Sequence, residues 1–229
     1  MGRKLLEQRA RVEKDRSYSP REALELLKSL DGAKFDESVE VHLKLNVDPR
    51  KADQMVRGTL MLPNGTGKTR RVAVFAVGEN AREAEEAGAD IVGSDDLAAR
   101  IRDENFFEFE VAVATPDQMS IVGRLGPVLG PRGLMPNPKS GTVTPNVGRA
   151  VEDIKRGKVE YRVDRYGIIH GIIGKKSFDV DSLVENYFAL RDELQRVRPA
   201  AVKGRYFRSV AIASSMGPSI AVDPAVERE

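Results

Sequence analysis

Apolar and polar residues alternate along residues 34–48 for longer than anywhere else in the chain. A β-strand projects successive side chains to opposite faces, so this pattern predicts a half-buried, antiparallel strand. Valines and leucines would line its inner face. Its outer face would carry Ser38, Glu40, His42, Lys44 and Asn46. Such an outer face suits either water or a polar partner, and the pattern alone does not decide between them.

Further periodic segments flank this strand. A helix is expected to begin at residues 19–22, where a serine N-cap, a proline at the first helical position and a glutamate three residues after the cap coincide. Residues 56–63 are interpreted as a second strand that pairs with the first. Towards the C-terminus we expect strands at 159–164 and 167–174, a helix at 180–196 capped by Ser177, and a final strand at 204–214. These segments predict an antiparallel α+β arrangement.

The middle third of the chain has a different pattern. Residues 72–77 form a continuous apolar run followed by Gly78, as expected for a strand buried on both faces of a parallel sheet. Strands at 90–92 and 111–114 follow, and they alternate with helices that are expected at 80–87, 94–101 and 144–155. This alternation predicts βαβ units in a parallel, doubly wound arrangement.

Residues 123–141 stand out within this third because they contain four prolines, five glycines and three cations but no carboxylate. Glycine and proline together specify a fixed, non-repetitive backbone. A loop this long is uncommon without a purpose. We interpret it as a basic functional loop, with a rigid Ω-like loop packed by its own apolar residues as the alternative.

The two patterns together predict a discontinuous two-domain protein whose fold class is α/β with α+β. An antiparallel-sheet α+β domain would form from both chain ends, residues 1–66 and 158–229. Residues 67–157 would form an inserted Rossmann-like parallel α/β domain. The two chain crossings, near residues 65–69 and 155–158, would act as a double-stranded hinge.

Composition excludes several functional classes. The chain has no cysteine and only two histidines, His42 and His170, which argues against thiolate chemistry and metal centres. No apolar run approaches the roughly 20 residues of a membrane span, and residues 1–16 lack the apolar stretch of a signal peptide. A cytoplasmic protein without cofactor or metal is therefore expected.

Nucleotide-binding motifs are also incomplete. Residues 67–69 match the end of a P-loop, but Leu62 stands where its first glycine should be. No G-x-G-x-x-G pattern follows the strand at 72–77. An enzyme that uses the insert as a nucleotide-binding domain remains the alternative class, and measurable turnover or saturable nucleotide binding would favour it.

Charge is unevenly distributed although the formal net charge is only +2. Acidic residues dominate residues 79–110, so the remainder of the chain is clearly basic. Such asymmetry indicates a polyanionic partner for one part of the molecule. Ordinary solubilising surface charge is the alternative explanation.

Three motifs make a family resemblance specific: KFDESVEVHLKLNVDPRKADQMVRGT, LGPVLGPRGLMPNPKSGTV and SSMGPS. In this order they resemble the bacterial large-subunit ribosomal protein of the mobile stalk beside the tRNA exit site, the ribosomal protein L-one family. The resemblance covers nearly the whole chain. It implies a non-enzymatic, ribosome-associated protein that binds a stem-junction of large-subunit rRNA, helps to move deacylated exit-site tRNA out of the ribosome, and represses its own mRNA. We expect a monomer when the protein is free.

The resemblance also implies the RNA-binding residues, to which Lys44 is added for its charge. They are Lys34, Phe35, Ser38, Glu40, Lys44, His170, Lys175, Ser177, Ser215, Met216 and Gly217. Arg124, Arg132 and Lys139 of the basic loop are candidate secondary RNA contacts. Ser38 and Ser215 stand where many relatives carry threonine, so these two contacts would keep the hydroxyl but lack the methyl group.

The residue types fit this assignment. Lys34, Lys44 and Lys175 would neutralise phosphates. Glu40 would accept hydrogen bonds from a 2′-hydroxyl or a base amine. Gly217 would let the backbone approach RNA closely. Phe35 would stack on a base or sugar, or else belong to the core. A non-ribosomal RNA-binding repressor with the same fold is the second alternative, and failure to co-sediment with large subunits would favour it.

Overall fold

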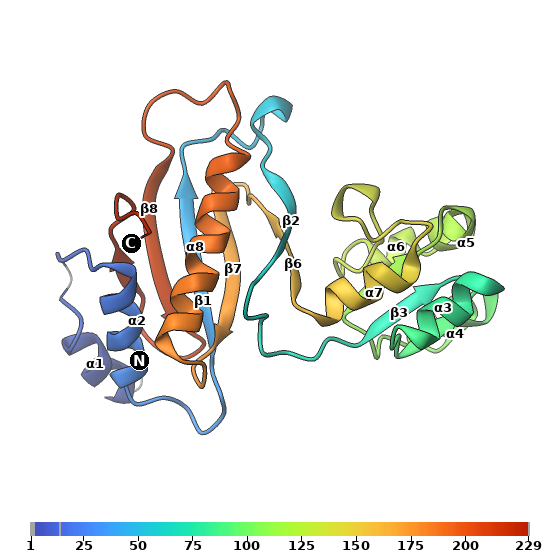
Figure 1. Cartoon of the computed structure of the whole chain (residues 1–229), viewed down its shortest axis with the longest axis horizontal. Helices are drawn as coiled ribbons and strands as arrows, with labels where there is room; N and C mark the ends of the chain where they lie inside the picture. Colours follow the sequence, from blue (N-terminus) through green and yellow to red (C-terminus); the bar gives the residue numbers. More distant parts are fainter. Residues whose placement is uncertain (1–2, 14, 229) are drawn as a thin grey trace. The chain divides into compact units, whose positions relative to one another are not determined.

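The structure is a computed structural model that describes residues 3–13 and 15–228. It divides into two compact units, Met1–Gly67 with Val159–Glu229 (unit 1) and Lys68–Lys158 (unit 2). Residues 1, 2, 14 and 229, which the predicted terminal domain includes, lie outside the described residues. The predicted fold class is confirmed, because unit 1 contains an antiparallel sheet formed by both ends of the chain and unit 2 contains a parallel one (Figure 1).

Unit 1 is built on β1 (Ser38–Leu45), which pairs antiparallel with β7 (Ile168–Lys175) on one edge and with β8 (Phe207–Ser214) on the other. A last strand, β9 (Ile220–Val222), gives the order β7-β1-β8-β9. The predicted inner face of β1 is at most 1% exposed from Val39 to Leu45. It belongs to one core with α2 (Pro20–Ser29) and α8 (Val180–Arg196), and Figure 1 shows α8 lying over the strands.

The helix starts follow local chemistry. The capping box of α2 is present, since the Ser19 hydroxyl accepts from the Glu22 amide at 3.2 Å and the Glu22 carboxylate accepts from the Ser19 amide at 3.0 Å. The predicted bounds of α8 are confirmed, but its predicted cap is wrong. Asp179 accepts from the Ser182 amide at 2.6 Å, while the Ser177 hydroxyl donates to Asp36. A carboxylate distant in sequence therefore takes the Ser177 hydroxyl.

Three further expectations were wrong. The second strand, β2 (Arg57–Met61), pairs with β6 (Lys158–Arg162) and not with β1, because β7 and β8 occupy both edges of β1. The strand ending at Ser214 is not the last one, since β9 follows it. The segment 123–141 is not a continuous loop: it includes the end of α5 (Met119–Arg124), α6 (Gly126–Leu129) and the 3₁₀ turn η3 (Pro138–Ser140).

Unit 1 also contains two short elements, α1 (Arg3–Ala10) and η1 (Ala52–Gln54).

Unit 2 has β3 (Val72–Phe75) between β4 (Ile91–Gly93) and β5 (Val111–Ala114), all parallel. Successive residues of β3 enter two separate cores, as predicted for a strand buried on both faces. Ala73 and Phe75 pack with α4 (Asp95–Asp103), α5 and α6, whereas Val72 and Val74 pack with α3 (Glu79–Glu86) and α7 (Val147–Lys155). A 3₁₀ turn, η2 (Pro116–Gln118), follows β5.

A buried amide secures the chain in unit 1 just before it leaves for unit 2. Asn186 of α8 is 0% exposed. Its side-chain NH₂ group donates to the Gly65 carbonyl at 2.9 Å and to the Ile173 carbonyl at 2.8 Å, and its oxygen accepts from the Asn64 amide at 3.0 Å. One side chain thus satisfies three backbone groups and ties residues 64–65 to β7 and α8.

His42 and His170 form a cross-strand pair on the outer face of β1 and β7. Their Nδ1 atoms are 2.8 Å apart, and Nε2 of His170 lies 3.4 Å from the Asp164 carboxylate. Burial, and then the neighbouring His170, lower the pKa of His42 despite the opposing effect of Glu40. The folded sheet therefore favours the neutral form of His42.

Replacing Asn186 by Ala should destabilise unit 1 by about 3 kcal/mol, because three buried backbone groups lose their partner. Urea unfolding followed by tyrosine fluorescence measures this, since the chain has no tryptophan and its five tyrosines all lie in unit 1. The control Asp192→Ala, at an exposed position of α8, should change stability by less than about 0.5 kcal/mol. Equal effects of the two variants would contradict the role of Asn186.

Unit 1 should lose stability as pH falls from 7.5 to 5.5. The unfolded chain binds a proton at His42 near pH 6.5, whereas the folded chain binds it only at lower pH. The stability that His42 contributes is therefore fully present above pH 6.5. It is lost as the pH falls through the lowered pKa of His42 in the folded chain. His42→Gln should reduce this slope by a fraction of a proton, as measured by tyrosine-detected urea midpoints at several pH values. An unchanged slope would show that His42 is not responsible.

Candidate RNA-binding interface

Three segments that are distant in the sequence meet at one end of unit 1. Residues 34–35 precede β1, residues 175–177 end β7 and begin the following turn, and residues 215–217 follow β8. Because β7 and β8 both run antiparallel to β1, their last residues lie beside its first: Ser38 is paired with Lys175, and Val39 with Ser214. Strand pairing therefore assembles most of the predicted RNA-binding residues into what we call the three-segment cluster.

The centre of this cluster is a carboxylate that sequence reasoning missed. Glu37 is 1% exposed. One carboxylate oxygen accepts from the Ala33 amide at 2.5 Å, and the other accepts from the Met216 amide at 3.0 Å. Burial by itself would raise the pKa of Glu37, but hydrogen bonds from the Ser214 hydroxyl and these amides, with Lys176 nearby, lower that pKa below its ordinary value. The buried group is therefore held in its charged form.

A signal for Glu37 existed in the alternation itself. Glu37 occupies the same parity as Val39 and Val41, so the strand pattern directs it inward, where an apolar residue is expected. A buried carboxylate is costly unless it is hydrogen-bonded. A charge at an inward position next to the strand start therefore indicates nearby donors.

The neighbouring Asp36 connects the second segment. Its carboxylate accepts from the Ser177 amide at 3.1 Å and from the Ser177 hydroxyl at 2.7 Å. Its backbone carbonyl accepts from the Lys175 ammonium at 3.1 Å. The consecutive acids Asp36 and Glu37 thus reach the other two segments of the cluster.

The cluster presents several side chains to solvent. Lys34, Ser177 and Ser215 are exposed, Phe35 is 57% exposed and Met216 is 63% exposed. The alternative that Phe35 belongs to the core is therefore excluded. An exposed ammonium, aromatic ring, thioether and hydroxyls offer phosphate contact, stacking and hydrogen bonding, which are the interactions used on structured RNA.

Two predicted residues have structural roles inside the cluster. Ser38 is only 6% exposed; its hydroxyl accepts from Lys175 at 3.3 Å and its amide donates to the Ser215 hydroxyl at 3.1 Å. A Cβ atom at Gly217 would lie 2.4 Å from the Ser214 hydroxyl oxygen. The absence of a side chain at Gly217 is therefore required by packing within the protein, before any RNA is considered.

The remaining predicted residues of unit 1 lie farther along the sheet. Glu40 and Lys44 are half-buried on the outer face of β1, and His170 is exposed opposite His42. Lys44 donates to the Tyr166 carbonyl. It is six residues from Ser38, about 20 Å along the strand, so Lys44 is not brought into the three-segment cluster.

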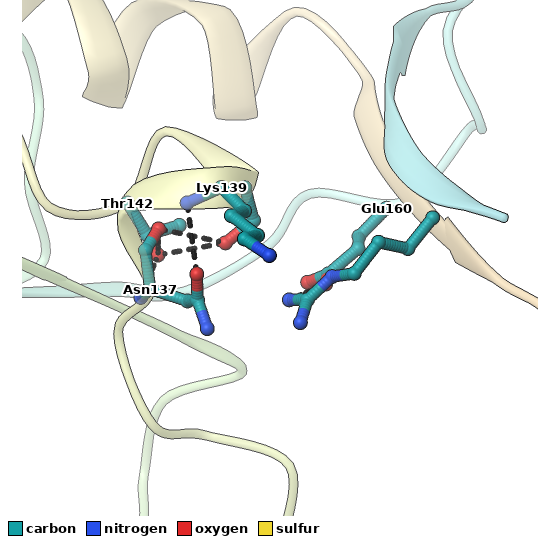
Figure 2. Close-up of polar contacts among 6 residues, drawn as sticks. Asn137, Lys139, Thr142 and Glu160 are labelled. Atoms are coloured by element: carbon teal, nitrogen blue, oxygen red, sulfur yellow. Dashed lines mark hydrogen bonds and ion pairs between the residues drawn. The ribbon is translucent and has the colours of Figure 1, made fainter. Parts of the chain in front are cut away.

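Within unit 2, Arg124, Arg132 and Lys139 are all exposed. Arg132 already has an intramolecular partner, since its guanidinium carbon lies 3.5 Å from the centroid of the Phe107 ring. The backbone at Lys139 is set by Asn137, whose side-chain oxygen accepts from the Lys139 amide at 2.8 Å (Figure 2).

Glu160, labelled in the same view, belongs to β6 and forms an ion pair with Arg57 of β2 at 3.3 Å.

Neither a group of metal ligands nor a membrane-spanning helix is found in the part of the chain that the structure describes. Within residues 3–13 and 15–228, no group of three or more histidine, cysteine, aspartate or glutamate side chains is placed to hold a metal ion. No helix in the same residues is long and apolar enough to cross a membrane.

Comparison with known proteins agrees with the resemblance noted from the motifs. A family model described as the Ribosomal protein L1p/L10e family matches residues 26–218. The Large ribosomal subunit protein uL1 of Rubrobacter xylanophilus is 82% identical over 228 residues, which span 100% of this chain and 99% of that protein. The chain therefore belongs to the Ribosomal protein L1p/L10e family, and this membership makes it a non-enzymatic constituent of the ribosome.

Proposed function

We propose that the three-segment cluster binds a stem-junction of large-subunit rRNA and so forms the mobile stalk beside the tRNA exit site. In this proposal the protein assists release of deacylated tRNA from that site and represses translation of its own mRNA by binding a similar RNA structure. The name of the similar protein, Large ribosomal subunit protein uL1, supports placement in the large subunit. When free, the protein is a monomer.

The observation that supports this proposal most is the convergence of the cluster. Residues 34–35, 175–177 and 215–217 come from three parts of the chain, yet strand pairing brings them to one end of the sheet. Their backbones are tied together by Asp36 and Glu37. A preorganised surface of this kind loses little conformational entropy when it binds.

In the proposal, residues 1–66 with 158–229 form the RNA-binding domain. Exposed Lys34 and half-buried Lys175 contact phosphates, and Phe35 packs against a base or sugar. Residues 67–157 form the inserted domain, where Arg124, Arg132 and Lys139 make secondary contacts with RNA or tRNA. Because Arg132 is already stacked on Phe107, its contact would use the free edge of the guanidinium.

Repression of the protein's own mRNA follows from the use of one surface for two RNAs. If the mRNA carries a structure similar to the stalk, both RNAs compete for the three-segment cluster. Free protein then binds the mRNA only after the rRNA sites are occupied. A variant that weakens stalk binding should therefore weaken mRNA binding in parallel.

The purified protein should bind an isolated rRNA stalk fragment about a thousandfold more tightly than a scrambled RNA, in the range of other specific nucleic-acid complexes. Gel-shift titration at two salt concentrations measures this preference, and affinity for both RNAs should fall with salt because the lysines displace counterions. Equal binding to both RNAs would leave a basic protein without the proposed stalk specificity. Failure to co-sediment with large subunits would instead favour a non-ribosomal repressor.

Replacing Glu40 by Gln should weaken binding to the stalk fragment about fivefold, because a charged acceptor becomes a neutral one. Glu25→Gln is the matched control, since it removes the same charge from an exposed position on α2. The control should leave affinity unchanged or raise it slightly. No loss of affinity for the Glu40 variant would exclude its role as an acceptor.

A further inference from the structure

We propose that the buried carboxylate of Glu37 is a positioning residue that gives the three-segment cluster its specificity for structured RNA. The inference rests on the proposed function of this cluster and deepens it. In this proposal Glu37 does not touch RNA. It holds the loop that carries Lys34 and Phe35 in a fixed place relative to the turn that carries Met216.

The geometry supports this role directly. One carboxylate oxygen accepts a hydrogen bond from the amide of Ala33, the residue next to Lys34. The other oxygen accepts a hydrogen bond from the amide of Met216, which is 179 positions from Glu37 in the sequence. One rigid group therefore spans the two loops whose exposed side chains, Phe35 and Met216, form the apolar part of the surface.

Only a carboxylate satisfies this position. Each of its two oxygens accepts a hydrogen bond from a different backbone amide. A glutamine has a single acceptor oxygen, so its NH₂ group would face one of the two amide donors. The site is also closely packed, since a Cβ atom at Gly32 would lie 2.8 Å from the nearer carboxylate oxygen of Glu37 and 3.1 Å from the Lys176 ammonium.

The sign of the expected effect separates positioning from simple charge. Glu37 is negative and lies beneath a surface that binds a polyanion, so charge alone predicts tighter RNA binding when Glu37 is neutralised. Positioning predicts the opposite result, because the two loops lose their common attachment. The loss should also be confined to RNA that needs both loops, and binding driven only by phosphate charge should remain.

The test compares three variants of the full-length protein: Glu37→Gln, Gly32→Ala and the control Glu25→Gln. Gly32→Ala changes no charge but places a methyl group against the Glu37 carboxylate, which must shift from its present position to make room. Both cluster variants should bind the stalk fragment at least tenfold more weakly than wild type. Affinity for scrambled RNA should be unchanged for Gly32→Ala and unchanged or slightly raised for Glu37→Gln, which removes a negative charge. The dependence of binding on salt should be unchanged in both variants, because no lysine is altered.

Two further readouts separate positioning from loss of fold. Tyrosine fluorescence should show that unit 1 is folded under the binding conditions, because all five tyrosines report on it. Hydrogen exchange should accelerate selectively at the amides of Ala33 and Met216, whereas the paired strands β1 and β8 keep their protection. If Glu37→Gln does not fold, Gly32→Ala decides the question alone.

The possible outcomes lead to different conclusions. If wild type does not prefer the stalk fragment, the proposed function fails and the inference falls with it. If wild type is specific and both cluster variants retain that preference, the inference alone is overturned. Tighter binding of Glu37→Gln to both RNAs, as expected for loss of a negative charge, would also overturn it. A tenfold or larger loss confined to stalk RNA, in both variants, supports it.

Discussion

The hydrogen bonding of β1 along both of its edges is the constraint on which unit 1 depends. Its partners, β7 and β8, both follow the insertion in the chain, so the sheet cannot close until the chain has returned from unit 2. Closing a flexible loop of roughly 90 residues costs about 4 kcal/mol, and this cost grows only logarithmically with length. Such an insertion is therefore tolerated if the returning segments add enough burial, which β7, β8 and α8 do by completing one core with β1.

The same constraint determines where the candidate site forms. Two antiparallel partners place their C-terminal ends at the N-terminal end of β1, so strand pairing by itself brings together the segments around Lys34, Lys175 and Ser215. The acids at positions 36 and 37 then use the backbone donors that become available where the strands end. The carboxylates of Asp36 and Glu37 in this way hold together a surface suited to RNA, while exposed Lys34 remains available for a phosphate.

Local patterns predicted what local chemistry determines. Alternation identified β1, the capping box identified α2, and continuous apolar runs identified the parallel strands of unit 2. Pairing is not local, so the partner of β2 was predicted wrongly, and three residues at β9 are too few to form a pattern. Ser177 shows the same limit, because a carboxylate far away in sequence competes for its hydroxyl. The site residues came mainly from the family resemblance, and Glu37 was missed because its parity on the strand is that of the buried Val39 and Val41, where a core residue is expected.

The distribution of charge between the units bears on how RNA would be shared between them. In unit 2, α3 and α4 begin with acidic residues and lie in the acidic span 79–110. Long-range attraction of RNA is therefore weaker at unit 2 than at unit 1. Asn137 sets the backbone at Lys139, whereas the Arg132 guanidinium itself is stacked on Phe107, so the cation of Arg132 is positioned rather than freely mobile. Contacts from unit 2 would then add geometry more than affinity, and the salt dependence of binding would arise chiefly from the lysines of unit 1.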